Sequence, residues 1–197
     1  MVDFFAGPFL VWSPKIVYFV FFVLGAVFYI FRRKFDLKKF SSILSVSFIF
    51  WRIFEAALKT GLQRYFWSLD DFTKVWTENG YWLDYSFRRF WLNIFVSILA
   101  AFVFFLLLKI LKKHKERFFE PGEVELGFFT VLLSGWPMFL FFLPMVFLSV
   151  VVISLVRQIV FGKIYTTLGY PLLLALLLTL VFANEIKSLF NLGIFKI

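Results

Sequence analysis

Several ionisable residues stand inside or directly beside the long apolar runs of this 197-residue chain, among them Asp36, Arg52, Glu55 and Glu123. An ionisable group is costly to hold near lipid hydrocarbon, so each of these residues is a candidate for function. Two carboxylates held close together can share a proton, because their like charges disfavour joint ionisation, and such a pair can activate water for peptide hydrolysis. We therefore treat Asp36 and Glu123 as a candidate catalytic acid–base pair.

Each of these residues also has a simpler interpretation. Arg52 and Glu55 lie three positions apart, so they share one helix face and are expected to form an intramembrane ion pair; a substrate or proton site is the alternative. Asp36 alone is typical of a solvated loop. Glu123 and Glu125 open an apolar run, where acidic side chains interact favourably with the positive end of a helix dipole.

The composition indicates the environment of the chain. Hydrophobic residues make up 62% of it and charged residues only 17%, whereas soluble domains are about half apolar and a quarter charged. A small soluble fold could not bury this much apolar surface, so lipid is the expected solvent. Cysteine is absent, which excludes disulfides, thiolate metal sites and a cysteine nucleophile, and the single histidine, His114, argues against serine–histidine chemistry.

The apolar runs predict an all-α, polytopic integral membrane bundle that forms one membrane domain over residues 1–197. Its six transmembrane helices are expected near residues 15–31, 40–58, 90–111, 124–136, 137–156 and 168–183. The apolar run 126–155 would measure about 45 Å as one helix, against a hydrocarbon core of about 30 Å. We therefore expect a break at Gly135-Trp136-Pro137, with 124–136 as a short full span or a re-entrant helix.

Charge orients the predicted bundle. The basic residues cluster in loops 32–39 and 109–117 and at Arg157 and Lys163, which the helix count places on one side. The positive-inside rule makes that side cytoplasmic, with the N-terminus outside a cell or inner membrane. The segment 59–89, rich in Trp and Tyr, is then an extracytoplasmic interfacial segment. The net charge of +9 thus indicates a lipid bilayer as partner and no nucleic acid.

The two candidate carboxylates occur in a recognisable order. Asp36-Leu37-Lys38 follows the first predicted span, and Gly122-Glu123-Val124-Glu125-Leu126-Gly127 opens the fourth. This pattern resembles the prepilin peptidase family (type IV leader peptidases, including the preflagellin type), in which one catalytic Asp stands in a D-L-[KR] context and a second in a G-x-G-D motif. Glu123 occupies the place of the second Asp.

The resemblance implies an aspartyl-type endopeptidase that removes leader peptides from pilin-like precursors at the cytoplasmic membrane boundary. Asp36 and Glu123 would be its catalytic pair, with no metal or organic cofactor. Because Glu stands in place of Asp, an inactive relative of the family is the alternative.

Two other functions stay open. The 33 Phe and seven Trp residues offer broad apolar faces, which suit a non-catalytic small subunit or scaffold of a larger membrane complex. The basic loop followed by Trp51-Arg52, together with Asn79-Gly80-Tyr81, more faintly resembles prolipoprotein diacylglyceryl transferases, which implies a lipid-modifying enzyme.

Overall fold

The computed structural model describes residues 10–69, 71–162, 166–183, 185 and 188, and within these residues the chain is helical and contains no strand. The N-terminal residues 1–9 and Lys163, which entered the predicted topology, lie outside the described part. The helices are α2 (Leu10–Ile30), α3 (Leu37–Leu69), α4 (Asp71–Glu78), α5 (Tyr81–Ser86), α6 (Leu92–His114), α7 (Glu123–Ser134), α8 (Phe139–Phe161) and α9 (Gly169–Val181). A π-helical turn at Phe87–Trp91 precedes α6, and a 3₁₀ turn at Glu116–Phe118 follows it.

A helix occupies each of the six predicted apolar segments, but the helices differ in length. Within the described residues, three are long and apolar enough to cross a membrane: Leu37–Leu69, Tyr81–His114 and Phe139–Val160. The second expected span ended at residue 58, whereas α3 continues without a break to Leu69. The fourth is the 12-residue helix α7, which reaches only about 18 Å. Length and composition are therefore compatible with a membrane protein, and crossing by all six helices is not established by them.

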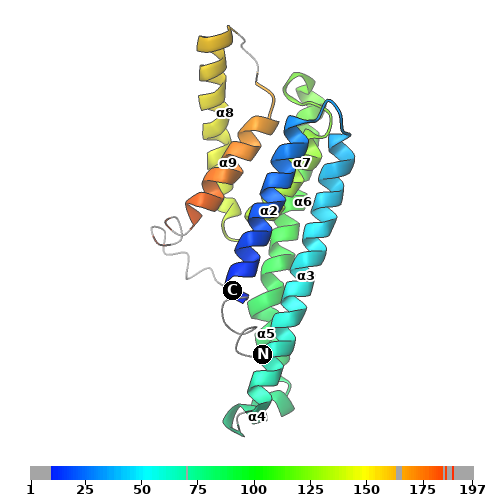
Figure 1. Cartoon of the computed structure of the whole chain (residues 1–197), viewed down its shortest axis with the longest axis vertical. Helices are drawn as coiled ribbons and strands as arrows, with labels where there is room; N and C mark the ends of the chain where they lie inside the picture. The colour runs from blue at the N-terminus through cyan, green and yellow to red at the C-terminus, as the bar shows by residue number, and fades with distance from the viewer. Residues whose placement is uncertain (1–9, 70, 163–165, 184, 186–187, 189–197) are drawn as a thin grey trace.

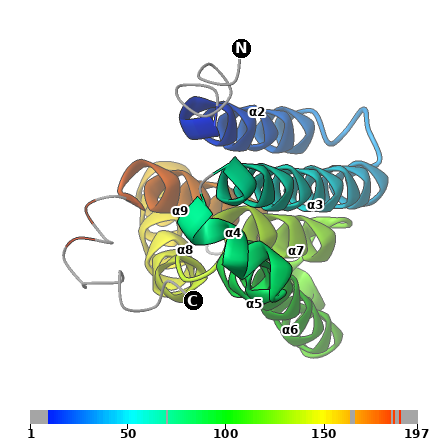
Figure 2. The same cartoon turned by 90° about the horizontal axis from the view of Figure 1, so that it is seen from below.

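Helix α7 is the centre of the bundle. It packs against α3, α6 and α9, and Figure 2 shows it enclosed between α3 and α6. Most of its side chains are buried, including Leu126, Phe129 and Leu133. A helix that is apolar on every face is stable only when other elements surround it, so this short helix depends on its neighbours for its position.

The two ends of the bundle differ. The connections α2–α3 and α6–α7 lie at one end, together with the end of α8, whereas α4 and α5 cap the opposite end beyond α3 (Figure 1). The predicted basic loops and the Trp-rich segment 59–89 therefore lie at opposite ends of the molecule. We call the end formed by α4, α5 and the last turns of α3 the aromatic cap.

Helix α8 is the most exposed long helix. It packs mainly against α9; its first half also contacts α6 and α7, whereas its second half stands apart from the bundle of α2, α3, α6 and α7 (Figure 1). Large apolar side chains point away from the protein along its length, with exposed fractions of 73% at Phe147 and 82% at Ile159. Apolar surface of this extent is typical of a face that contacts lipid or a partner protein.

Candidate functional site

Glu123 begins α7, and its side chain is completely buried, with 0% of its surface exposed. Its Oε1 accepts hydrogen bonds from the Tyr29 hydroxyl at 3.0 Å and from the Gly169 amide at 2.8 Å. Its Oε2 accepts from the amides of Glu120 at 2.9 Å and Leu168 at 3.3 Å. A carboxylate offers about four acceptor sites, so protein donors occupy all of them and none remains to bind a water.

The donors show that the Glu123 carboxylate links three parts of the chain: the end of α2, the turn before α7 and the start of α9. Leu168 and Gly169 lie at the start of α9, where the first amides of a helix have no acceptor within the helix and carry partial positive charge. Glu123 accepts from them as an N-cap side chain would, although it comes from another helix. A Cβ at Gly169 would lie 2.2 Å from the ring of Tyr29. The Tyr29 ring, which comes from α2, therefore fits against α9 only because residue 169 is a glycine.

Arg32, in the turn after α2, extends this arrangement. Its Nη2 lies 3.1 Å from Oε1 of Glu120, and its Nε donates to Oε2 of the same carboxylate. The guanidinium lies 4.5 Å from the ring centre of Tyr29 and 5.4 Å from that of Tyr170, and the two rings meet edge to face. Cation–π and aromatic contacts of this kind add to the hydrogen bonds. We call Tyr29, Arg32, Glu120, Glu123, Leu168 and Gly169 the Glu123 clasp.

Two opposing effects act on the pKa of Glu123. Burial disfavours the charged form and raises the pKa above its ordinary value of 4.5, whereas the hydrogen bonds from Glu120, Gly169 and Tyr29 lower it; burial prevails. The hydrogen bonds to Glu120 raise the pKa of Arg32 further above its ordinary range, so this guanidinium stays charged.

Asp36, the other candidate carboxylate, has a different environment. Its side chain is 52% exposed, and its Oδ1 accepts the amide of Lys39 at 3.3 Å, which is the hydrogen bond of an N-cap residue at the start of α3. Gly122 has φ +88°, and a Cβ there would lie 2.7 Å from the Lys38 amide nitrogen. The turn before α7 therefore packs directly on the first turn of α3, so Asp36 and Glu123 come from neighbouring helix starts, yet their carboxylates bind different groups.

Arg52 and Glu55 belong to a four-residue polar cluster in the middle of α3. Arg52 Nη1 lies 3.4 Å from Glu55 Oε2 and donates to the Tyr18 hydroxyl at 2.7 Å, which links α3 to α2. Lys59 Nζ lies 2.6 Å from Glu55 Oε1. The sequence identified Arg52 and Glu55, and the periodicity of α3 places Lys59 on the same face, but nothing in the sequence pointed to Tyr18.

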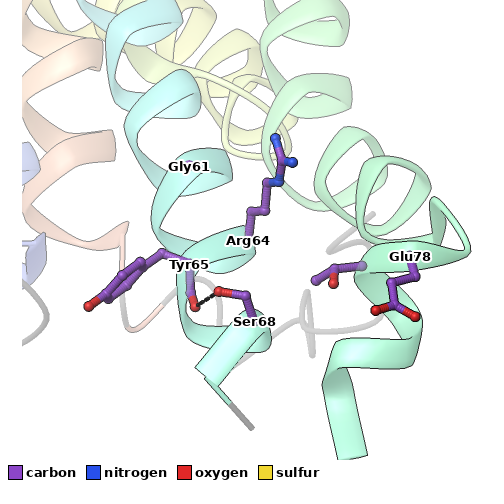
Figure 3. Close-up of a pocket in the computed structure, with 6 residues that line it drawn as sticks. Gly61, Arg64, Tyr65, Ser68 and Glu78 are labelled. Atoms are coloured by element: carbon purple, nitrogen blue, oxygen red, sulfur yellow. Dashed lines mark hydrogen bonds between the residues drawn. The ribbon is translucent and has the colours of Figure 1, made fainter. Parts of the chain in front are cut away.

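The aromatic cap contains two open clefts. One, of about 510 Å³, is lined by Gly61, Arg64, Tyr65, Ser68, Thr77 and Glu78 (Figure 3). The other, of about 940 Å³, is lined by Trp67, Trp76, Asn79, Gly80, Tyr81, Asp84 and Tyr85. We call the first the polar cleft and the second the aromatic cleft.

Protein partners already engage much of the polar cleft. The Ser68 hydroxyl donates to the Tyr65 carbonyl at 2.7 Å, as the dashed line in Figure 3 marks, and the Tyr65 ring points away from Glu78. The Thr77 hydroxyl donates within α4, and the Arg64 guanidinium lies 5.0 Å from the ring centre of Trp82. These contacts stabilise the cap and leave little free polarity to recognise a ligand.

The sequence missed the features that decide the chemistry of Glu123. Three of its four donors are backbone amides, two of them 45 and 46 residues further along the chain, and a backbone amide has no residue-type signature. Tyr29, 94 residues away, could have been suspected only as a polar group at the end of an apolar helix. The arrangement holds helix ends together, and it keeps the Glu123 carboxylate away from solvent.

The chain matches no family model, and it shows no significant similarity to a curated protein or to a solved structure.

Proposed function

We propose that this chain is a non-catalytic integral membrane protein, a small subunit or scaffold of a larger membrane complex. One observation carries the proposal: the carboxylate of Glu123 is buried, and four protein donors fill its acceptor sites. A general base must reach the proton or the water that it activates. A residue in this state serves to hold α2, α7 and α9 together.

The membrane topology is part of the same proposal. The six helical segments cross or enter the bilayer, the basic loops 32–39 and 109–117 face the cytoplasm, and the N-terminus and the aromatic cap face outside. The three long apolar helices and the position of the cap at the end opposite these loops support this orientation (Figure 1).

Helix α8 supplies the surface for partner helices. Its packing is mainly against α9, and its outer face carries a shallow apolar groove between Leu140 and Val151. Helices associate in lipid through close packing of such faces. A subunit that is already held together by the Glu123 clasp can offer this face without losing its own fold.

The test is purification of the full chain from its native membrane in a mild detergent, with a photo-crosslinking residue at Phe147 of α8. A stoichiometric partner that crosslinks at Phe147 is the expected result. The matched control places the crosslinker at Leu99 of α6, which is 63% exposed. A chain that purifies alone, without a crosslinked protein at Phe147, contradicts the subunit proposal.

Peptidase activity is the second candidate, because one observation favours it. Gly122 packs on the first turn of α3, so the helix starts that carry Asp36 and Glu123 are neighbours, as the prepilin peptidase pattern requires. The test is cleavage of a pilin-like precursor by the full chain in lipid vesicles. Cleavage that is lost in both Asp36→Asn and Glu123→Gln, with the fold retained, supports this candidate; no cleavage by the native chain removes it.

A further inference from the structure

The aromatic cleft collects four aromatic rings from three consecutive helices. Trp67 of α3 lies centrally: its ring centre is 5.4 Å from that of Trp76, 6.3 Å from that of Tyr81 and 5.0 Å from that of Tyr85. The planes of Trp67 and Tyr81 are within 7° of parallel. The faces of aromatic rings carry negative electrostatic potential and attract cations within about 6 Å of the ring centre.

The charges of the cleft favour a cation as well. Asp84 is the one ionisable acid among the residues that line it, and no Lys or Arg of the described residues does so, although the chain as a whole carries a net charge of +9. Arginines of the cap do use ring faces nearby, since the Arg89 guanidinium lies 5.8 Å from the centre of the Tyr85 ring. The cleft therefore combines ring faces with one carboxylate, and the nearest cations, Arg88 beside Asp84 and Arg89 beside Tyr85, are not among the residues that line it.

We propose that the aromatic cleft binds a quaternary ammonium group, such as the trimethylammonium group of choline. Several ring faces around one carboxylate suit a methylated cation, because its methyl groups contact the rings and its charge is weakly hydrated. A volume of about 940 Å³ is within the range of small-molecule sites. The chemistry is shared by a free choline-type solute and by the headgroup of a choline lipid.

Ion pairing modulates the site. Asp84 Oδ2 lies 3.0 Å from Nε of Arg88, and both side chains are more than half exposed. This pair partly neutralises the carboxylate that the ligand would meet. Removal of the Arg88 charge should therefore strengthen binding, which is the opposite of the effect expected when a merely structural contact is lost.

The experiment titrates the full chain in a neutral detergent with tetramethylammonium and with choline, and follows binding by ligand-observed NMR. The control ligand is 3,3-dimethyl-1-butanol, the uncharged carbon analogue of choline. We expect both cations to bind and the neutral analogue to bind at least about five-fold more weakly, since a cation–π interaction of about 1 kcal/mol corresponds to that factor. Equal binding of the neutral analogue, or no binding of either cation, overturns the proposal.

Variants then locate the site. Asp84→Asn and Trp76→Leu should each weaken binding about five-fold, and Arg88→Gln should strengthen it. Trp82→Leu is the matched control, because Trp82 belongs to the same helix as Asp84 but lies under Arg64 and does not line the cleft. Binding that falls equally in Trp82→Leu and Trp76→Leu overturns the assignment to this cleft.

The source of the cation is decided in nanodiscs. If choline lipids supply the ligand, discs of phosphatidylcholine should abolish the binding of added tetramethylammonium, whereas discs of phosphatidylglycerol should retain it. If a free solute is the ligand, both discs should retain it. Loss of binding in both discs, with the fold intact, would contradict either source.

Discussion

Replacement of Glu123 tests the clasp most quantitatively. Glu123→Ala removes all four acceptor contacts, whereas Glu123→Gln keeps the shape of the side chain but exchanges one acceptor oxygen for an NH₂ donor. The cost depends on which donors find another acceptor, because a buried donor without a partner is penalised and one that re-pairs is not.

Two of the four donors have such an alternative. The Leu168 amide also donates to the Phe118 carbonyl at 3.2 Å, and the Tyr29 hydroxyl lies 3.4 Å from Oγ1 of Thr167. Without Glu123 these two groups keep a partner.

The amides of Glu120 and Gly169 have no such alternative acceptor among the contacts of the clasp. Each orphaned buried amide costs about 1–3 kcal/mol, so we expect Glu123→Ala to lower the free energy of unfolding by about 4 kcal/mol. In Glu123→Gln one oxygen still serves Gly169, and the NH₂ group then faces the amides of Glu120 and Leu168. The Leu168 amide keeps the Phe118 carbonyl, so one backbone amide is left without an acceptor. That variant should lose about 2 kcal/mol.

Unfolding of the full chain in mixed micelles, followed by circular dichroism, measures these differences. Glu125→Gln is the matched control: it changes an acid in the same turn of α7 that is partly exposed, and it should alter the free energy of unfolding by less than about 0.5 kcal/mol. If Glu123→Ala is as stable as the native chain, or if Glu123→Gln is less stable than Glu123→Ala, the reasoning on orphaned donors is refuted.

Three further predictions use the same unfolding assay. Gly169→Ala should be destabilised by more than about 2 kcal/mol, because the new methyl group overlaps the Tyr29 ring; a neutral result would show that the ring can move aside. Asp36→Ala should lose about 1 kcal/mol with the N-cap, and Asp36→Asn should lose almost nothing, since Asn caps equally well; equal losses would mean that the negative charge matters more than the cap. Finally, because the pKa of Glu123 is raised in the folded state, the folded chain binds this proton more tightly than the unfolded chain. The protonation of Glu123 therefore contributes fully to the free energy of unfolding below pH 4.5, and this contribution declines as the pH rises through the folded-state pKa. Glu123→Gln should remove this decline in stability. A variant whose stability depends on pH as the native chain's does would contradict the assignment of the decline to Glu123.

The helices were predictable where hydropathy and helix signals coincide. Pro137, after Gly135, marks the break between α7 and α8, and α7 indeed ends at Ser134 while α8 begins at Phe139. The end of α3 was misplaced by about 11 residues for a physical reason. Hydropathy falls at Lys59, but Lys, Gln and Arg are good helix formers, so the helix continues beyond the apolar segment.

The site was less predictable than the fold. The sequence singled out Glu123 as a catalytic candidate, because a carboxylate at the start of an apolar run can be recognised from the sequence alone. Its role depends on the amides of Leu168 and Gly169 and on the hydroxyl of Tyr29, which only the tertiary packing brings to it. The aromatic cleft had a clearer signal in the density of Trp and Tyr in 59–89, although the sequence did not reveal which rings share a cavity.

An experimental structure of the full chain in a lipid nanodisc, at a resolution that shows ordered water around Glu123, tests the central claim most directly. The account predicts a dry carboxylate within hydrogen-bonding distance of the Tyr29 hydroxyl and the Gly169 amide, with Asp36 bound to the first turn of α3. A Glu123 carboxylate that instead faces Asp36 across a hydrated cleft would contradict the account and would favour peptidase chemistry.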